Sequence, residues 1–166
     1  SYILQTPDRE ELAQEVLLSG STSGLDKITY DPHSWMSIVN AQSYLNSINM
    51  KLAERCPELR NRFNKNKVKA VTTLTNLEFE YKKKFESCSK NSFVTTHYAY
   101  AYLARDFGLT QWPLQGLTSM QDPSLKTIRK AIYYCRDKGI DTIFYESNTA
   151  SKGAEAIALE IGGMAQ

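Results

Sequence analysis

The sequence lacks most of the features that mark the common functional classes of protein. Its 166 residues contain no apolar run near the about 18 residues that a membrane-spanning helix needs. The net charge of +2 is too small to suggest nucleic-acid binding. The GxGxxG, P-loop, HExxH and GxSxG patterns are all missing. These absences argue against membrane-spanning proteins, nucleic-acid binders and the most familiar enzyme classes.

Cysteine is scarce and widely spaced. The chain has three cysteines, Cys56, Cys88 and Cys135, and no CxxC pair. This spacing argues against zinc ribbons and thioredoxin-like redox sites. The odd count leaves at least one thiol free. We expect three partly buried structural thiols, with one disulfide as the alternative.

The first half of the chain reads as helical. A short strand is expected at 2–4 and a helix at 6–18, followed by a loop of small residues at 19–24. A second helix follows Asp31 and Pro32, with an apolar stripe expected to face inward: Ile38, Ala41, Leu45, Ile48 and Leu52. A long polar helix is expected at 58–85, solvated over most of its surface.

The second half alternates strands and helices. Strands are expected at 92–96, 109–114 and 141–146, and Pro113 indicates either that the second strand lies at an edge or that it ends there. Helices are expected at 98–107, after 122–124 and at 151–161. Short connections between alternating strands and helices predict a parallel sheet covered by helices, and so an α/β fold.

The two histidines of the sequence stand at turns where metal ligands are often found. His97 directly follows a predicted strand, and Glu146 occupies the matching position of a later strand. Ligands of parallel α/β sheets bind at these carboxyl ends. His33 lies at the front of a helix. Imidazole nitrogen is a good zinc ligand, although position alone also fits histidines that only form hydrogen bonds and a Glu146 that caps backbone amides.

Three segments of the sequence belong together as a set of motifs. The first is Asp31-Pro32-His33-Ser34-Trp35, the second runs from Phe93 through His97 to Leu103, and the third joins Asp122-Pro123-Ser124 to Ile143-Phe144-Tyr145-Glu146. Together they resemble one known family, the solute-binding proteins of zinc and manganese ABC transporters. The resemblance covers most of the chain, and the order and separation of the two histidine motifs fit as well as their residues.

The resemblance implies a fold of two small parallel-sheet lobes joined by a long rigid helix, with a metal cleft between the lobes. Residues 1–56 would belong to the N-terminal lobe, 57–88 would form the linking helix, and 89–166 would belong to the C-terminal lobe. It also implies a receptor without catalysis at the periplasmic or extracytoplasmic face of a bacterial membrane. Such a receptor delivers Zn²⁺ to an ABC permease and is held, if at all, by a lipid anchor outside this chain.

By the same resemblance, His33 and His97 are the metal ligands, one from each lobe, and Glu146 and Asp31 support them. The family also uses a histidine before His33 and an acid after Gly163, which this sequence lacks, so we expect a chain truncated at both ends that binds zinc weakly on its own. Nitrogen ligands favour zinc over manganese. Zinc affinity should fall below about pH 6.5, where ordinary histidines become protonated.

Three alternatives remain open at this stage. The same scaffold could select manganese or iron, or the metal could merely stabilise an adhesin-like interaction protein. A metal-dependent hydrolase with Glu146 as general base beside His97 is the enzyme alternative, and no motif supports it.

Overall fold

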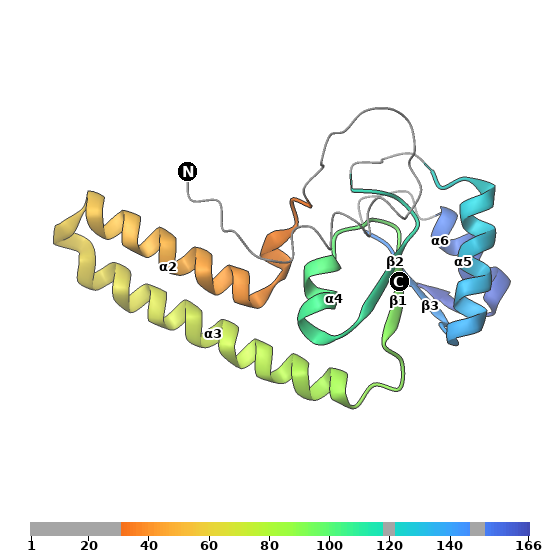
Figure 1. Cartoon of the computed structure of the whole chain (residues 1–166), viewed down its shortest axis with the longest axis horizontal. Helices are drawn as coiled ribbons and strands as arrows, with labels where there is room; N and C mark the ends of the chain where they lie inside the picture. Colours follow the sequence, from red (N-terminus) through yellow and green to blue (C-terminus); the bar gives the residue numbers. More distant parts are fainter. Residues whose placement is uncertain (1–30, 118–121, 147–151) are drawn as a thin grey trace.

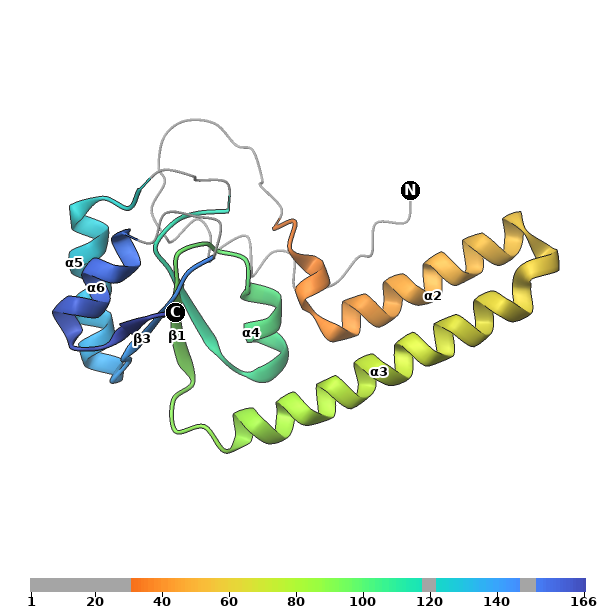
Figure 2. The same ribbon diagram turned by 180° about the vertical axis from the view of Figure 1, so that it is seen from behind.

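A computed structural model describes residues 31–117, 122–146 and 152–166, so the strand, helix and loop expected before residue 25 lie outside the described residues. The chain forms a long helical hairpin beside a body in which a parallel sheet lies between helices (Figure 1; Figure 2). The predicted α/β class and long helix are thereby confirmed. No helix in these three ranges is long and apolar enough to cross a membrane.

The hairpin consists of α2 (Ile38–Arg55) and α3 (Arg60–Glu86), joined by the 3₁₀ turn η2 (Pro57–Leu59). Pro57 stands at the start of that turn, where its missing N–H leaves no hydrogen bond unmade. No residue of α3 is fully buried, as expected from its narrow apolar stripe. Packing against α2 and ion pairs between successive turns, such as Lys82 with Glu78, support it instead.

Polar contacts fix how α2 and α3 lie against each other. Gln42 Nε2 donates to Thr75 Oγ1 at 3.1 Å, and Asn49 Nδ2 donates to Asn64 Oδ1 at 2.9 Å. As the first residue moves forward along the chain, its partner moves backward, so the helices are antiparallel. The start of α2 therefore lies near the end of α3.

The inward stripe predicted for α2 is only partly correct. Ile38 is buried, but Ile48 and Leu52 are 54% and 42% exposed. Among the described elements α2 packs chiefly against α3 alone, and one neighbouring helix covers only a narrow strip of its surface. Ala53, which the pattern did not single out, is buried toward the end of α2.

An aromatic cluster joins the hairpin to the sheet body. Tyr81 and Phe85 of α3 meet Phe107 at ring-centroid distances of 5.8 and 5.2 Å, and they lie 5.7 Å from each other. Edge-on and tilted contacts of this kind add to the burial of the rings themselves. This cluster anchors the end of the long helix.

Four strands form the sheet in the order β2-β1-β3-β4, with every pair parallel. They are β1 (Ser92–Thr95), β2 (Thr110–Pro113), β3 (Thr142–Phe144) and β4 (Met164–Ala165). Pro113 lies on β2 at one edge of this sheet, which confirms its predicted position. The two-residue β4 was not predicted.

Helices cover both faces of the sheet (Figure 1). Helix α4 (Ala101–Phe107), which connects β1 to β2 along the chain, covers one face. Helices α5 (Leu125–Lys138) and α6 (Lys152–Ile161) pack on the opposite face. Gly108 and Gly139 end α4 and α5 with φ of 67° and 63°, a left-handed conformation that glycine adopts without steric cost.

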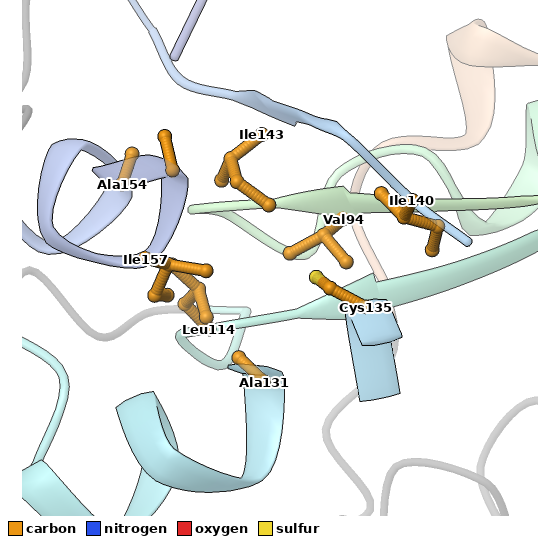
Figure 3. Packing of buried hydrophobic residues seen from close by; sticks show 9 residues of the cluster. Val94, Leu114, Ala131, Cys135, Ile140, Ile143, Ala154 and Ile157 are labelled. Carbon is orange, nitrogen blue, oxygen red and sulfur yellow. The ribbon is translucent and has the colours of Figure 1, made fainter. Parts of the chain in front are cut away.

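The hydrophobic core lies between the sheet and the α5–α6 face (Figure 3). Ile143 and Ile157 are 0% exposed, and each contributes roughly 1.5–3 kcal/mol by leaving water. Cys135 is also fully buried there, and burial raises the pKa of its thiol. Cys56 is half-buried, but Cys88 is exposed just beyond α3, so the expectation of a partly buried thiol was wrong at that position. All three thiols are free.

Candidate metal site

His97 lies at the point where the chain changes direction across the sheet. The chain passes from β1 to β2 on one side and later returns to place β3 on the other side of β1. Parallel sheets bind ligands at such a switch point, outside the carboxyl ends of the strands. Thr96 N donates to Phe144 O at 3.0 Å, which continues the pairing up to His97. The chain then stays irregular through Tyr100, so α4 begins later than the predicted residue 98.

The turn that carries His97 is held by side chains from β1 and β2. Thr95 Oγ1 donates to the His97 carbonyl at 2.7 Å. Gln111 Nε2 donates to that same carbonyl at 2.9 Å and to Thr95 Oγ1 at 2.6 Å. Gln111 Oε1 accepts from Tyr100 N at 3.0 Å. No motif in the sequence marked Gln111, whose partners lie 11 to 16 residues away.

Glu146 lies beside His97, because β1 and β3 are neighbours in the sheet and each residue follows the end of its strand. Its Oε1 is 2.9 Å from His97 Nδ1, and both side chains are partly exposed. The second ring nitrogen, Nε2, lies 3.2 Å from the carbonyl oxygen of Leu117. The alternative role for Glu146, capping amides of residues 148 and 149, falls outside the described residues.

His33 directly precedes the short 3₁₀ turn η1 (Ser34–Met36), which in turn precedes α2. Asp31 Oδ1 accepts a hydrogen bond from the His33 backbone N–H at 2.9 Å. The same oxygen lies 2.7 Å from His33 Nδ1. Asn40 Nδ2 donates to Ser34 O at 3.1 Å, and Tyr44 O–H donates to Ser34 Oγ at 2.7 Å. The first turns of α2 thus fix the conformation of η1, and Tyr44 is a contributor that the sequence did not reveal.

The two imidazoles, 64 residues apart in the chain, lie against each other. Their ring centroids are 4.9 Å apart with the planes at 83°. The structure therefore brings together the two residues that the motifs singled out. Trp35 is 58% exposed, and its ring makes a T-shaped contact with that of His33 at a centroid distance of 5.5 Å.

Charge around this pair favours a cation. Each imidazole has a carboxylate beside it, Asp31 at His33 and Glu146 at His97. The Asp31 side chain is only 5% exposed, and its Oδ2 has no hydrogen-bond partner among the described residues. A buried carboxylate is costly unless a positive charge lies nearby. A divalent cation at the imidazoles would supply that charge.

The described residues bring together fewer potential ligands than a complete zinc site has. In ranges 31–117, 122–146 and 152–166, no three histidine, cysteine or acidic side chains are grouped so that they could enclose an ion. Two imidazoles, each with a carboxylate on Nδ1, are what these ranges provide. Structural zinc sites usually have four ligands, which is more than these two imidazoles supply.

Comparison with known proteins gives consistent matches. The chain is 33% identical over 132 residues to the high-affinity zinc uptake system protein ZnuA of Bacillus subtilis (strain 168), a match that covers 80% of this chain and 41% of that protein. Among solved structures, the laminin-binding protein Lbp of Streptococcus pyogenes has a TM-score of 0.78 and 32% identity, covering 87% of this chain and 57% of that one. The Zn(II)-bound E280Q variant of AdcAII of Streptococcus pneumoniae has a TM-score of 0.74 and 30% identity, covering 85% and 51%.

The chain thus spans about two-fifths of the length of the curated relative and little more than half of the two solved structures. The match to a family extends over nearly the whole chain, from residue 4 to residue 166. That family is described as zinc-uptake complex component A, periplasmic, and the chain belongs to it.

Proposed function

We propose that this chain is part of a receptor that binds Zn²⁺ outside the cytoplasmic membrane and delivers it to an ABC-type permease, with zinc as cargo and no catalysis. The main observation in support is the pair of imidazoles, whose ring centroids are 4.9 Å apart and each of which is hydrogen-bonded through Nδ1 to a carboxylate. A carboxylate on one nitrogen fixes the tautomer and orientation of an imidazole and makes its other nitrogen a better ligand.

In this proposal His33 and His97 bind zinc through Nε2. Zinc at His97 would take the place of the contact between Nε2 and the Leu117 carbonyl. Asp31 and Glu146 orient the rings and balance the charge of the ion. Two nitrogen ligands favour zinc over manganese, which prefers oxygen.

The proposal also assigns a role to each part of the chain. Residues 1–56 belong to one lobe, 57–88 form the linking helix and 89–166 belong to the second lobe, so that His33 and His97 reach the ion from different lobes. The permease is the expected protein partner, since a zinc-uptake component must pass its zinc to a transporter in the membrane. A lipid anchor outside this chain would hold the receptor at the membrane.

The test is metal analysis and a competitive titration of the full-length protein, purified without added metal. We expect one zinc per molecule, binding far tighter than manganese, and a loss of at least about a hundredfold in zinc affinity for His33→Ala or His97→Ala. Tyr133→Ala, which removes a ring 65% exposed on α5, is the control and should bind like the parent. Tight zinc binding by both histidine variants would overturn the assignment.

The adhesin alternative is tested with the same variants. The name of one structural neighbour, a laminin-binding protein, supports this second candidate. If the protein binds immobilised laminin, and His33→Ala abolishes that binding without unfolding the protein, zinc would serve as a structural ion in an adhesin. If the protein does not bind laminin, zinc delivery remains the proposed function.

A further inference from the structure

Gln111 stands on a different strand from His97 and still contacts the turn that carries it. In the sheet register Gln111 of β2 lies opposite Phe93 of β1, four residues before His97. Its side chain extends along the sheet toward the carboxyl end of β1, where it meets Thr95, the His97 carbonyl and Tyr100. The two strands are adjacent in the sheet body (Figure 1).

The amide of Gln111 is bonded at both ends. Its nitrogen donates to the Thr95 hydroxyl at 2.6 Å and to the His97 carbonyl at 2.9 Å. Its oxygen accepts from Tyr100 N at 3.0 Å. Reversing the amide would place oxygen against the His97 carbonyl and nitrogen against an N–H, so only one orientation satisfies these contacts. The side chain therefore ties residue 95 to residue 100 across the irregular segment that carries His97.

The segment that carries His97 has backbone contacts of its own at its start, because Thr96 N donates to Phe144 O at 3.0 Å and Gln115 N donates to Thr96 O at 2.9 Å. The segment is neither strand nor helix between Thr96 and Tyr100. Thr95 is 2% exposed, so the hydroxyl that connects Gln111 to the His97 carbonyl is shielded from water. Hydrogen bonds in such an environment are stronger and costlier to lose than bonds at the surface.

We propose that Gln111 is a positioning residue for zinc binding: it holds the backbone of His97 so that the imidazole meets His33 before the ion arrives. The inference rests on the proposed function. Glu146 sets the rotation of the ring through Nδ1, while Gln111 sets the position of the backbone from which the ring projects. An ion that finds its ligands already placed does not have to order them.

The experiment compares three variants in the full-length protein. Gln111→Leu keeps the approximate volume of the side chain and removes all three hydrogen bonds. Gln111→Glu keeps an acceptor for Tyr100 N but has no donor for the His97 carbonyl. Gln42→Leu is the matched control, because it makes the same change in the hairpin and removes one exposed hydrogen bond to Thr75.

Two measurements are made on each variant: a competitive zinc titration, and the imidazole ¹⁵N resonances of His97 in the metal-free protein, assigned with His97→Gln. We expect zinc affinity to fall by about ten- to a hundredfold in Gln111→Leu and Gln111→Glu, with shifted or broadened His97 resonances, and to stay within about twofold of the parent in Gln42→Leu. Gln111→Glu carries the test if Gln111→Leu does not fold.

Unchanged zinc affinity in a Gln111 variant with a lower melting temperature would overturn the proposal and make Gln111 a structural brace only. If the parent itself binds no zinc, the proposed function fails, and the resonances still decide this inference. His97 signals that move in the Gln111 variants and not in Gln42→Leu support positioning, and signals that stay unchanged refute it.

Discussion

The carboxylates beside the two imidazoles differ in how far they are removed from water. The Asp31 side chain is 5% exposed, while that of Glu146 is 35% exposed. The same hydrogen bond to Nδ1 therefore operates in two dielectric environments, and the charge of Asp31 should act more strongly on its ring. Removing Glu146 should accordingly be the milder of the two perturbations.

Substituting Glu146→Gln should weaken zinc binding less than His97→Ala does. The amide oxygen can still accept from His97 Nδ1, so the ring keeps its orientation and only the charge is lost. We expect a loss of about tenfold for Glu146→Gln, the lower end of what supporting residues contribute. Calorimetric titration of the full-length variants measures both. Equal losses would mean that Glu146 is itself a ligand.

Tyr44→Phe should loosen the turn that carries His33. The phenol donates to Ser34 Oγ at 2.7 Å, and its loss should cost about 1 kcal/mol of unfolding free energy. Urea denaturation monitored by circular dichroism measures the change. Tyr133→Phe, which alters an exposed ring of α5, is the control. A Tyr44→Phe midpoint equal to the control would show that the Ser34 contact contributes nothing.

Sequence reasoning identified His33, His97 and Glu146 because each stands at the start of a helix or the end of a strand, where a motif can be read locally. Gln111 and Tyr44 escaped it. Their partners lie 10 to 16 residues away on other elements, and only the packing of those elements brings them together. A residue that supports a site through its neighbours leaves no local pattern.

Helix ends are the elements that local chemistry specifies most strongly. Ser124 precedes α5 and its hydroxyl accepts from Thr127 N at 3.1 Å, which satisfies one of the exposed N–H groups of the first turn. Gly108 and Gly139 terminate α4 and α5 in the left-handed conformation. These three boundaries could be predicted because the signal and its effect lie within one turn.

Gly139→Ala should destabilise the protein through backbone conformation alone. No atom lies within 4 Å of the position that an added Cβ would occupy, so space is available, but φ is +63°. A side chain in that region costs about 1–2 kcal/mol. Gly116→Ala is the matched control, since it also has open space and its φ is not in the left-handed range. Equal unfolding midpoints in urea for the two variants would contradict the argument.

Elements whose existence depends on a distant partner were harder to predict. The strand β4 has only Met164 and Ala165, and it is a strand because β3 lies beside it. The stripe on α2 failed at Ile48 and Leu52 for a related reason: periodicity reports which side of a helix is apolar, and neighbouring elements decide which part of that side is covered.

At the scale of the whole molecule, the hairpin meets the sheet body at two places close together. One is the aromatic cluster of Tyr81, Phe85 and Phe107, and the other is the meeting of His33 with His97 beside α4. Both lie at the open end of the hairpin, because Tyr81 and Phe85 stand near the end of α3 and His33 comes shortly before the start of α2. Coupling between the two halves of the described structure is therefore concentrated in a small region.

Phe107→Ala should weaken that coupling on both sides at once. Loss of the ring removes the packing of Tyr81 and Phe85 on α4 and should cost about 2 kcal/mol, less than for a fully buried phenylalanine. Hydrogen exchange should become faster both at the end of α3 and in α4. Phe79→Ala, which removes a ring 73% exposed on α3, is the control. Faster exchange in α4 alone would show that the cluster does not anchor the long helix.

Because the hairpin meets the sheet body at this junction, a rotation of the hairpin would pivot close to the imidazole pair. Helix α2 starts at the junction and extends for 18 residues, so at about 1.5 Å per residue the η2 tip lies about 27 Å away. A rotation of about ten degrees about this point would move the tip by about 5 Å. It would move His33, which lies close to the pivot, by a small fraction of that distance. Displacements of the tip are thus greatly reduced at the imidazoles, whereas a small rotation of the hairpin at the junction moves its tip by several ångströms.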